Sequence, residues 1–188
     1  MGKLRKKISF FFSFLYWKNK SGSIKVVKES KIPHWTIFKP AWMMDNFLSD
    51  KASLVVPSLK EGVIETSIKP NTKLDLICAY DQAKFVRDAF ENIEKYDKQE
   101  IPLTSVKMTT QEIGEVLSKT LNKNIKVIYT EPDLLAKKKG FFKPLTDSYD
   151  WNNFEGYQVD LEKVKERGID MISLEEFCKL YINRFDIL

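Results

Sequence analysis

The sequence predicts an α/β protein in which a short array of strands is followed by a helix-rich C-terminal part. Of its 188 residues, 43% are hydrophobic and 30% are charged, a composition typical of a globular domain and not of a disordered chain. Short runs rich in β-branched and aromatic residues alternate with segments in which apolar residues recur every three or four positions. This alternation is typical of a sheet covered by helices.

The first predicted element is a buried strand over residues 8–17, where the run ISFFFSFLYW is apolar on both faces. A basic stretch precedes the run, so a signal or membrane-association role is an open alternative. The run is shorter than the ~20 residues that span a bilayer, and no Ala-x-Ala cleavage site follows it. We expect a loop over 18–22, a helix over 23–31 and a strand over 34–39.

In the middle of the chain, residues 41–48 predict an apolar loop or short helix, and residues 53–56 and 62–67 predict short strands. Leucine and cysteine alternate through 73–80, which indicates another strand. Asp81 is expected to cap the helix that follows, which runs to Glu94. The apolar face of that helix comprises Ala83, Val86, Ala89, Phe90 and Ile93.

Two capping boxes organise the C-terminal part. Thr109-x-x-Glu112 opens a helix, and Ser173-x-x-Glu176 opens another. The inward residues of the two helices are predicted to be Ile113, Val116, Leu117 and Leu121 in the first, and Phe177, Leu180 and Tyr181 in the second. The remaining expected elements are strands over 100–103 and 125–129, a helix over 131–139, an aromatic loop over 140–156 and a helix over 161–167 closed by Gly168.

The charge distribution argues against a nucleic-acid-binding surface. The net charge is +5, but residues 1–39 carry ten bases and one acid, whereas residues 40–188 carry 21 bases and 25 acids. The basicity therefore belongs to one end of the chain. Its body does not have the composition of a phosphate-binding surface, and we expect no nucleic-acid partner.

Rare residues exclude several kinds of site. The chain has one histidine, His34, so a His-based metal site and a catalytic Ser-His or Cys-His pair are both disfavoured. Cys78 and Cys178 lack CxxC spacing and are expected to be buried, reduced thiols of a cytoplasmic protein. The seven glycines are too dispersed to write G-x-G-x-x-G or a P-loop, so no pyrophosphate cradle is present.

An ordered series of motifs resembles the NmrA-like branch of the atypical short-chain dehydrogenase/reductases. The series is SKIPHWTIFKPAWMMDNFL at 30–48, LDLICAYDQAKFVRDAF at 74–90, EKYDKQEIPL at 94–103 and the capped helix at 109–121. The resemblance implies the C-terminal part of a Rossmann-like parallel sheet with a small α+β substrate or effector subdomain. The family's glycine-rich first turn and first βα units have no counterpart, so it also implies a truncated chain without the N-terminal half.

The resemblance suggests a division into two parts that form one structural unit. Residues 1–48 would be the remnant of the sheet, a strand–helix–strand, and residues 49–188 would hold the last sheet strand and the C-terminal subdomain.

The same resemblance implies an NAD(P)(H)-binding protein, either an NAD(P)H-dependent reductase or a redox sensor. Its implied cofactor-binding residues are Ser13, Lys20, Pro40, Ala41, Trp42 and Met43. A substrate pocket would be built from Met44, Asn46, Phe47, Phe141 and Trp151. An equally strong alternative is that these aromatic and apolar residues are core.

Catalytic residues are not evident. Tyr16-x-x-x-Lys20 has the spacing of a short-chain dehydrogenase Tyr/Lys pair, but composition alone yields about one such pair, and Tyr16 falls on a predicted strand. Without a pyrophosphate cradle, cofactor binding by this chain alone is in doubt.

The competing hypothesis is a non-enzymatic, degenerate paralogue that acts as a protein-interaction module. The strand at 8–17 would be an exposed edge through which the chain forms a homodimer or pairs with a separate N-terminal half. A basic, aromatic membrane-binding segment over 1–28 is a weaker hypothesis.

Overall fold

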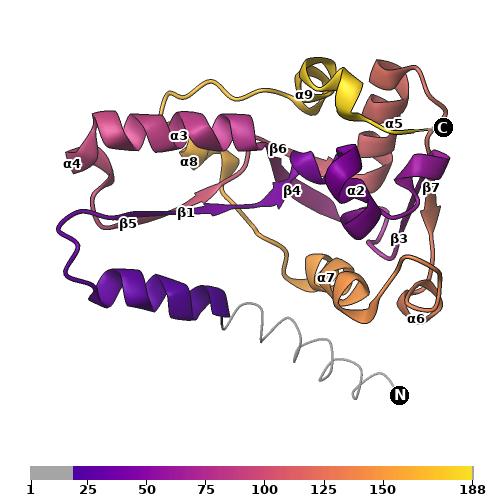
Figure 1. Cartoon of the computed structure of the whole chain (residues 1–188), viewed down its shortest axis with the longest axis horizontal. Coiled ribbons are helices and arrows are strands. Elements are labelled where there is room, and N and C mark those ends of the chain that lie inside the picture. The colour runs from indigo at the N-terminus through magenta and orange to yellow at the C-terminus, as the bar shows by residue number, and fades with distance from the viewer. Residues whose placement is uncertain (1–18, 188) are drawn as a thin grey trace.

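A computed structural model describes residues 19–187, which form three small, mainly parallel sheets with helices packed around them (Figure 1). Strand β1 (Thr36–Pro40) pairs in parallel with β5 (Gln99–Leu103), and β3 (Val63–Thr66) pairs in parallel with β7 (Lys126–Tyr129). The predicted α/β class is confirmed. The strand predicted over residues 8–17 lies outside the described residues.

The third sheet is mixed. Strand β4 (Lys73–Ile77) lies between β2 (Trp42–Met43), which is parallel to it, and β6 (Val106–Thr109), which is antiparallel. β2 follows β1 after a single residue, Ala41, so one continuous segment contributes to two sheets. The sequence motifs did not predict β6.

Helices lie on both sides of the β1–β5 pair. Helix α3 (Ala79–Glu91), followed by α4 (Ile93–Tyr96), covers one side, and the helix over 19–29 covers the other (Figure 1). The loop predicted over 18–22 is wrong for residues 19–22, which are helical. Ser21 and Ser23 did not break the helix.

Most of the other helices surround the sheets at the opposite end of the molecule. They are η1 (Met44–Phe47), α2 (Ser49–Val55), η2 (Leu59–Glu61), α5 (Thr110–Leu121), α6 (Pro132–Leu135), α7 (Lys143–Phe154), α9 (Leu174–Leu180) and η3 (Ile182–Arg184). Helix α8 (Leu161–Lys165) instead packs beside β5, and its Val164 belongs to the same core cluster as Phe85 of α3. Two predictions fail here, because residues 53–55 belong to α2 and not to a strand, and the loop predicted over 140–156 contains α7. Both predicted capping boxes are confirmed.

The register of α3 differs from the prediction. Cys78 caps the helix, its sulfur accepting the backbone N–H of Asp81 at 3.4 Å, so Asp81 lies one turn inside. Phe85 is fully buried, whereas the predicted core residue Phe90 is 77% exposed. Leu180 of α9, also predicted to be buried, is exposed. In both helices the apolar residues outnumber the positions that face the core.

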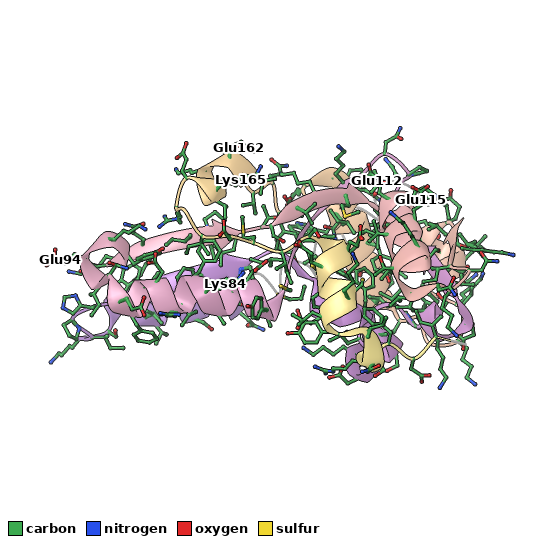
Figure 2. The ribbon with its side chains drawn as sticks, turned by 90° about the horizontal axis from the view of Figure 1, so that it is seen from above. Lys84, Glu94, Glu112, Glu115, Glu162 and Lys165 are labelled. Carbon is green, nitrogen blue, oxygen red and sulfur yellow. The ribbon has the colours of Figure 1, made fainter. Side chains whose placement is uncertain are left out.

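The core has two parts. The larger cluster includes Met44, Leu76 and Leu117 and fills the space between the β2–β4–β6 and β3–β7 sheets and helices α2, α5 and α9. The smaller cluster, which includes Phe85 and Tyr96, lies between the β1–β5 pair and α3. The two ends are well separated: Glu94 of α4 lies at one end of the molecule, and Glu112 and Glu115 of α5 lie at the other (Figure 2).

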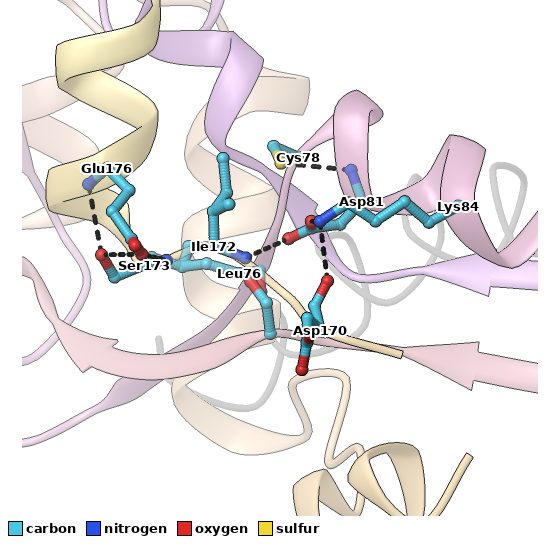
Figure 3. Close-up of polar contacts among 9 residues, drawn as sticks. Leu76, Cys78, Asp81, Lys84, Asp170, Ile172, Ser173 and Glu176 are labelled. Atoms are coloured by element: carbon cyan, nitrogen blue, oxygen red, sulfur yellow. Dashed lines mark hydrogen bonds and ion pairs between the residues drawn. The ribbon is translucent and has the colours of Figure 1, made fainter. Parts of the chain in front are cut away.

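A buried polar cluster joins the start of α3 to the connector between α8 and α9, residues 166–173 (Figure 3). Asp81 is fully buried and accepts the backbone N–H of Ile172 at 3.0 Å. Lys84 lies 3.0 Å from the other carboxylate oxygen of Asp81 and donates to the carbonyl of Asp170 at 2.7 Å. These bonds fix the connector just before the capping box of α9.

Candidate functional site

The main concavity of the described residues is an open cleft of about 1830 Å³. It is lined by the segments that follow the carboxyl ends of three parallel strands: Ala41–Met43 after β1, residues 67–70 after β3 and residues 130–133 after β7. In α/β proteins, ligands bind outside the carboxyl ends of parallel strands, because the loops there can diverge without disturbing the sheet. The cleft is therefore the candidate site.

One wall of the cleft comes from the helix over 19–29 and from the β1–β5 pair. Lys39 of β1 lies 3.1 Å from the carboxylate of Glu100 of β5, and Lys28 pairs with the other oxygen of that carboxylate. The bonds from Lys28 and Lys39 hold the pKa of Glu100 below its usual range. Lys39 and Glu100 both line the cleft, so this wall presents an ion cluster with a net positive charge.

The segment between β1 and η1 is anchored at both ends. Ala41 donates its N–H to the carbonyl of Leu103 at 2.9 Å, which joins the segment to β5. Asp45 accepts the N–H of Ala79 at 2.9 Å, which joins it to the first turn of α3. The ring of Trp42 packs on that of Phe47 with centroids 4.8 Å apart. The floor of the cleft is thus held by the sheet, the helix and the core together.

The opposite wall combines the loop after β3 with helix α7, and one side chain joins the two. The Asn153 amide oxygen accepts the N–H of Lys69 at 2.7 Å and the hydroxyl of Thr72 at 3.1 Å. The amide nitrogen of Asn153 donates to the carbonyl of Ser67 at 2.9 Å. Three hydrogen bonds from one side chain therefore set the course of this loop.

Aromatic rings contribute much of the cleft surface. Trp151 and Tyr157 meet edge to face with centroids 4.9 Å apart, and the indole N–H of Trp151 donates to Glu155 at 3.0 Å. The aromatic residues that line the cleft are Phe38, Trp42, Tyr129, Trp151, Phe154 and Tyr157. Flat apolar rings of this kind suit flat, partly apolar ligands.

The structure brings most of the predicted site residues to this one cleft. Those that line it are Lys20, Pro40, Ala41, Trp42, Met43, Asn46 and Trp151. Three predicted pocket residues do not line it: Met44, Phe47 and Phe141 are 0%, 3% and 8% exposed and belong to the larger core cluster. For these three the structure favours the alternative that they are core. The η1 turn buries Met44 and Phe47, whereas Asn46 between them lines the cleft. Ser13 and Tyr16 lie outside the described residues.

Sequence reasoning missed the contribution of α7. Lys143, Thr146, Asp150 and Phe154 of this helix all line the cleft. Their spacing, with intervals of three and four residues, is that of one helical face, and it was readable in the sequence. The sequence nevertheless predicts an aromatic loop here, because the apolar residues of the segment do not form a clean stripe.

No metal centre or membrane span emerges from the part of the chain that the structure describes. Within residues 19–187, no group of three His, Cys, Asp or Glu side chains could hold a metal ion. Over the same range, every helix is too short or too polar to cross a bilayer.

Comparison with known families agrees with this geometry. The model of the NmrA-like family matches residues 5–181. The chain belongs to the NmrA-like family. A search of curated proteins finds no match for the sequence of this NmrA-like chain.

Solved structures share the NmrA-like fold at low sequence identity. An NADPH-dependent quinone oxidoreductase from Escherichia coli matches with a TM-score of 0.68 and 17% identity, over 88% of this chain and 61% of its own. A nucleoside-diphosphate-sugar epimerase from Staphylococcus aureus matches with a TM-score of 0.64 and 18% identity, over 84% and 56%. NmrA, a negative transcriptional regulator in complex with NADP, matches at 0.59 and 14%, over 80% and 54%. The chain thus spans a little over half the length of these structures.

Proposed function

We propose that the cleft binds the nicotinamide end of NAD(P)(H) beside a small organic substrate, and that the protein is part of an NAD(P)H-dependent reductase. The observation that carries this proposal is the position of the cleft, where the segments after β1, β3 and β7 meet. Membership of the NmrA-like family supports it. So do similar structures described as an NADPH-dependent quinone oxidoreductase and as a triphenylmethane reductase complexed with NADP(H).

The residues present fit one end of a dinucleotide and not the other. The segment from Pro40 to Met43 offers backbone and flat apolar surface at the strand ends, which suits a nicotinamide ring. The pyrophosphate needs a glycine-rich turn, whereas the two closest glycines, Gly156 and Gly168, stand 12 positions apart (168 − 156). We therefore assign to this chain only the nicotinamide end of the site.

In this proposal the cofactor, when bound, supplies a hydride, and the chain binds and orients. Lys20, which lines the cleft from the helix over 19–29, would contact the ribose next to the nicotinamide. The ion cluster of Lys28, Lys39 and Glu100 would hold β1 and β5 at a fixed spacing next to the bound ribose. The rings of Trp42 and Trp151 would exclude water from the nicotinamide and the substrate.

Calorimetric titration with two ligands tests the assignment. NADPH and reduced nicotinamide mononucleotide share the nicotinamide end, and only NADPH has the adenosine half. We expect both to bind in the micromolar range with dissociation constants within about threefold, since the sequence has no glycine-rich turn to hold the pyrophosphate that leads to the adenosine half. Lys20→Gln should weaken both, and Lys51→Gln, an exposed site on α2 away from the cleft, should change neither. Absence of binding at millimolar ligand would contradict the proposal.

The second candidate function is that of a non-enzymatic protein-interaction module. Exposed apolar side chains favour it. Val26 is 70% exposed and Phe90 is 77% exposed, on the two helices that flank the β1–β5 pair. Within residues 19–187, β1 has a strand partner on one edge only, so its other edge is open to a second copy or to an N-terminal half. The segment 8–17 proposed for this contact lies outside the described residues. A monodisperse monomer in light scattering would count against pairing between copies.

A further inference from the structure

Lys69 differs from Lys39 and Lys143, two other lysines that line the cleft. Lys39 pairs with Glu100, and Lys143 pairs with Asp147. The Lys69 ammonium instead lies 5.3 Å from the centroid of the Phe154 ring, and among residues 19–187 no carboxylate forms an ion pair with it. An exposed ammonium held over an aromatic face keeps its full charge available to a ligand.

The backbone that carries Lys69 is fixed on both sides. Asn153 accepts the N–H of Lys69 and binds the carbonyl of Ser67, as described above. The hydroxyl of Thr66 accepts the N–H of Ile68 at 3.0 Å, and Thr72 donates its N–H to the carbonyl of Lys69 at 3.0 Å. The side chain of Lys69 therefore starts from a rigid loop, which reduces the entropy lost when it binds a ligand.

Ser67 provides an independent sign of a missing partner. Ser67 is one of the residues that border the cleft, it is 9% exposed, and its buried hydroxyl oxygen has no hydrogen-bond partner within the described structure. A buried hydroxyl without a partner is unfavourable, and such groups commonly mark a place that a ligand or water completes. Ser67 and Lys69 stand two positions apart on the same wall of the cleft.

The surface next to them is aromatic. Phe154 lies under the Lys69 ammonium, and Trp151 and Tyr157 form the adjacent edge-to-face pair. Glu155 is on this wall too, but its carboxylate accepts the indole N–H of Trp151. A ligand that meets this wall would need a flat ring for the aromatic surface and an acceptor, best an anionic one, for Lys69 and Ser67.

We propose that Lys69 and Ser67 bind the anionic group, such as a carboxylate, of a planar aromatic substrate, with Asn153 as the positioning residue for both. This inference rests on the proposed function, because it identifies the substrate class of the same cleft. The anionic group is recognised by the loop after β3, and the ring packs on the aromatic residues of α7 and the segment after it.

Two isosteric probes test the inference without any reaction: 2-naphthoate and its neutral amide, 2-naphthamide. Calorimetry on the full chain at low salt should show the naphthoate binding about fivefold more tightly, the upper end of what an exposed ammonium contributes. Lys69→Gln should remove this preference, whereas Lys51→Gln should retain it. Asn153→Ala should reduce the preference, and adding Lys69→Gln to it should remove only the part that remains, because both act through the same ammonium.

Each remaining result has a defined meaning. Equal affinity of the wild type for the two probes, or a preference that survives Lys69→Gln, would overturn the proposal. A weaker NADPH affinity in Lys69→Gln with an unchanged naphthoate preference would also overturn it, by assigning the lysine to a cofactor phosphate. Failure of the wild type to bind NADPH would refute the proposed function alone, since the two naphthalene probes measure the anion preference without the cofactor.

Discussion

Phe38 of β1 packs against Phe85 of α3, with ring centroids 6.4 Å apart and planes tilted by 58°. This contact joins the strand that leads into the cleft to the helix behind it, since Phe85 belongs to the smaller core cluster and Phe38 packs against that cluster. The position of the cleft floor therefore depends on a small core that is separate from the larger one.

Replacement of Phe85 tests that core, with Phe90 as a control on the same helix. Phe85 is fully buried, so Phe85→Ala should lower the free energy of unfolding by about 3–5 kcal/mol. Phe90 is 77% exposed, and Phe90→Ala should change stability by no more than about 0.5 kcal/mol. Urea titration followed by circular dichroism measures both. A large loss in Phe90→Ala with little loss in Phe85→Ala would mean that α3 has the register predicted from the sequence.

Asp81 should contribute more to the free energy of unfolding than an exposed acidic residue of the same helix. Asp81→Ala would leave the Ile172 N–H and the Lys84 ammonium without their shared acceptor, at a cost of about 3 kcal/mol. Glu91→Ala, which removes an exposed ion pair with Arg87 from the same helix, should cost less than about 0.5 kcal/mol. Urea midpoints distinguish the two, and a small effect at Asp81 would show that the connector is held by packing alone.

The capping boxes predict a pH dependence of stability. The backbone N–H of Thr109, and then its hydroxyl, lower the pKa of Glu112, and the same groups of Ser173 lower the pKa of Glu176. Because the folded-state pKa lies below the unfolded value, this stabilisation is fully present above the unfolded pKa of about 4.5 and is lost as the pH falls through the folded pKa.

The double variant Glu112→Gln with Glu176→Gln should show a shallower loss of stability than the wild type as the pH falls below about 4.5. Glu115→Gln, on the same helix as Glu112 but outside the capping box, is the control and should follow the wild type. Urea midpoints measured from pH 7 down to pH 3 give the comparison. Parallel curves for the double variant and the wild type would contradict the prediction.

Both cysteines should resist modification in the folded protein. Cys78 and Cys178 are free and fully buried, and burial raises the pKa of each thiol to about 12. Since the thiolate is the reactive form, iodoacetamide at pH 8 should label the native protein at least about 100-fold more slowly than the protein in urea. Mass spectrometry of timed samples gives the rates. Rapid native labelling of Cys178 would indicate that α9 opens locally.

Elements with a strong local signal were predicted well from the sequence. The two capping boxes fixed the starts of α5 and α9, and alternation or β-branched residues located β1, β3, β4, β5 and β7. These signals are local: a cap needs four residues, and a half-buried strand needs only its own alternation. The NmrA-like family followed from the order of several such segments along the chain.

The failures have tertiary causes. In α3 both Phe85 and Phe90 are apolar, and the choice between them depends on Asp81, which turns inward because Ile172 and Lys84 are there to meet it. Residues 53–55 carry a strand-like pattern but form part of α2. No local pattern marks Ser67 or Lys69 as site residues, because their relation to Asn153 joins segments more than 80 positions apart.

The clamp formed by Asn153 has a consequence for how the cleft selects its ligands. Helix α7 and the loop after β3 are joined by three hydrogen bonds from a single amide, which hold the two sides of this wall together. The cleft is therefore preorganised on this side, and a ligand loses little free energy to rearrangement when it enters. Discrimination between similar molecules would then arise from shape and charge in the resting protein, and rates of association would be set by encounter and not by a conformational step.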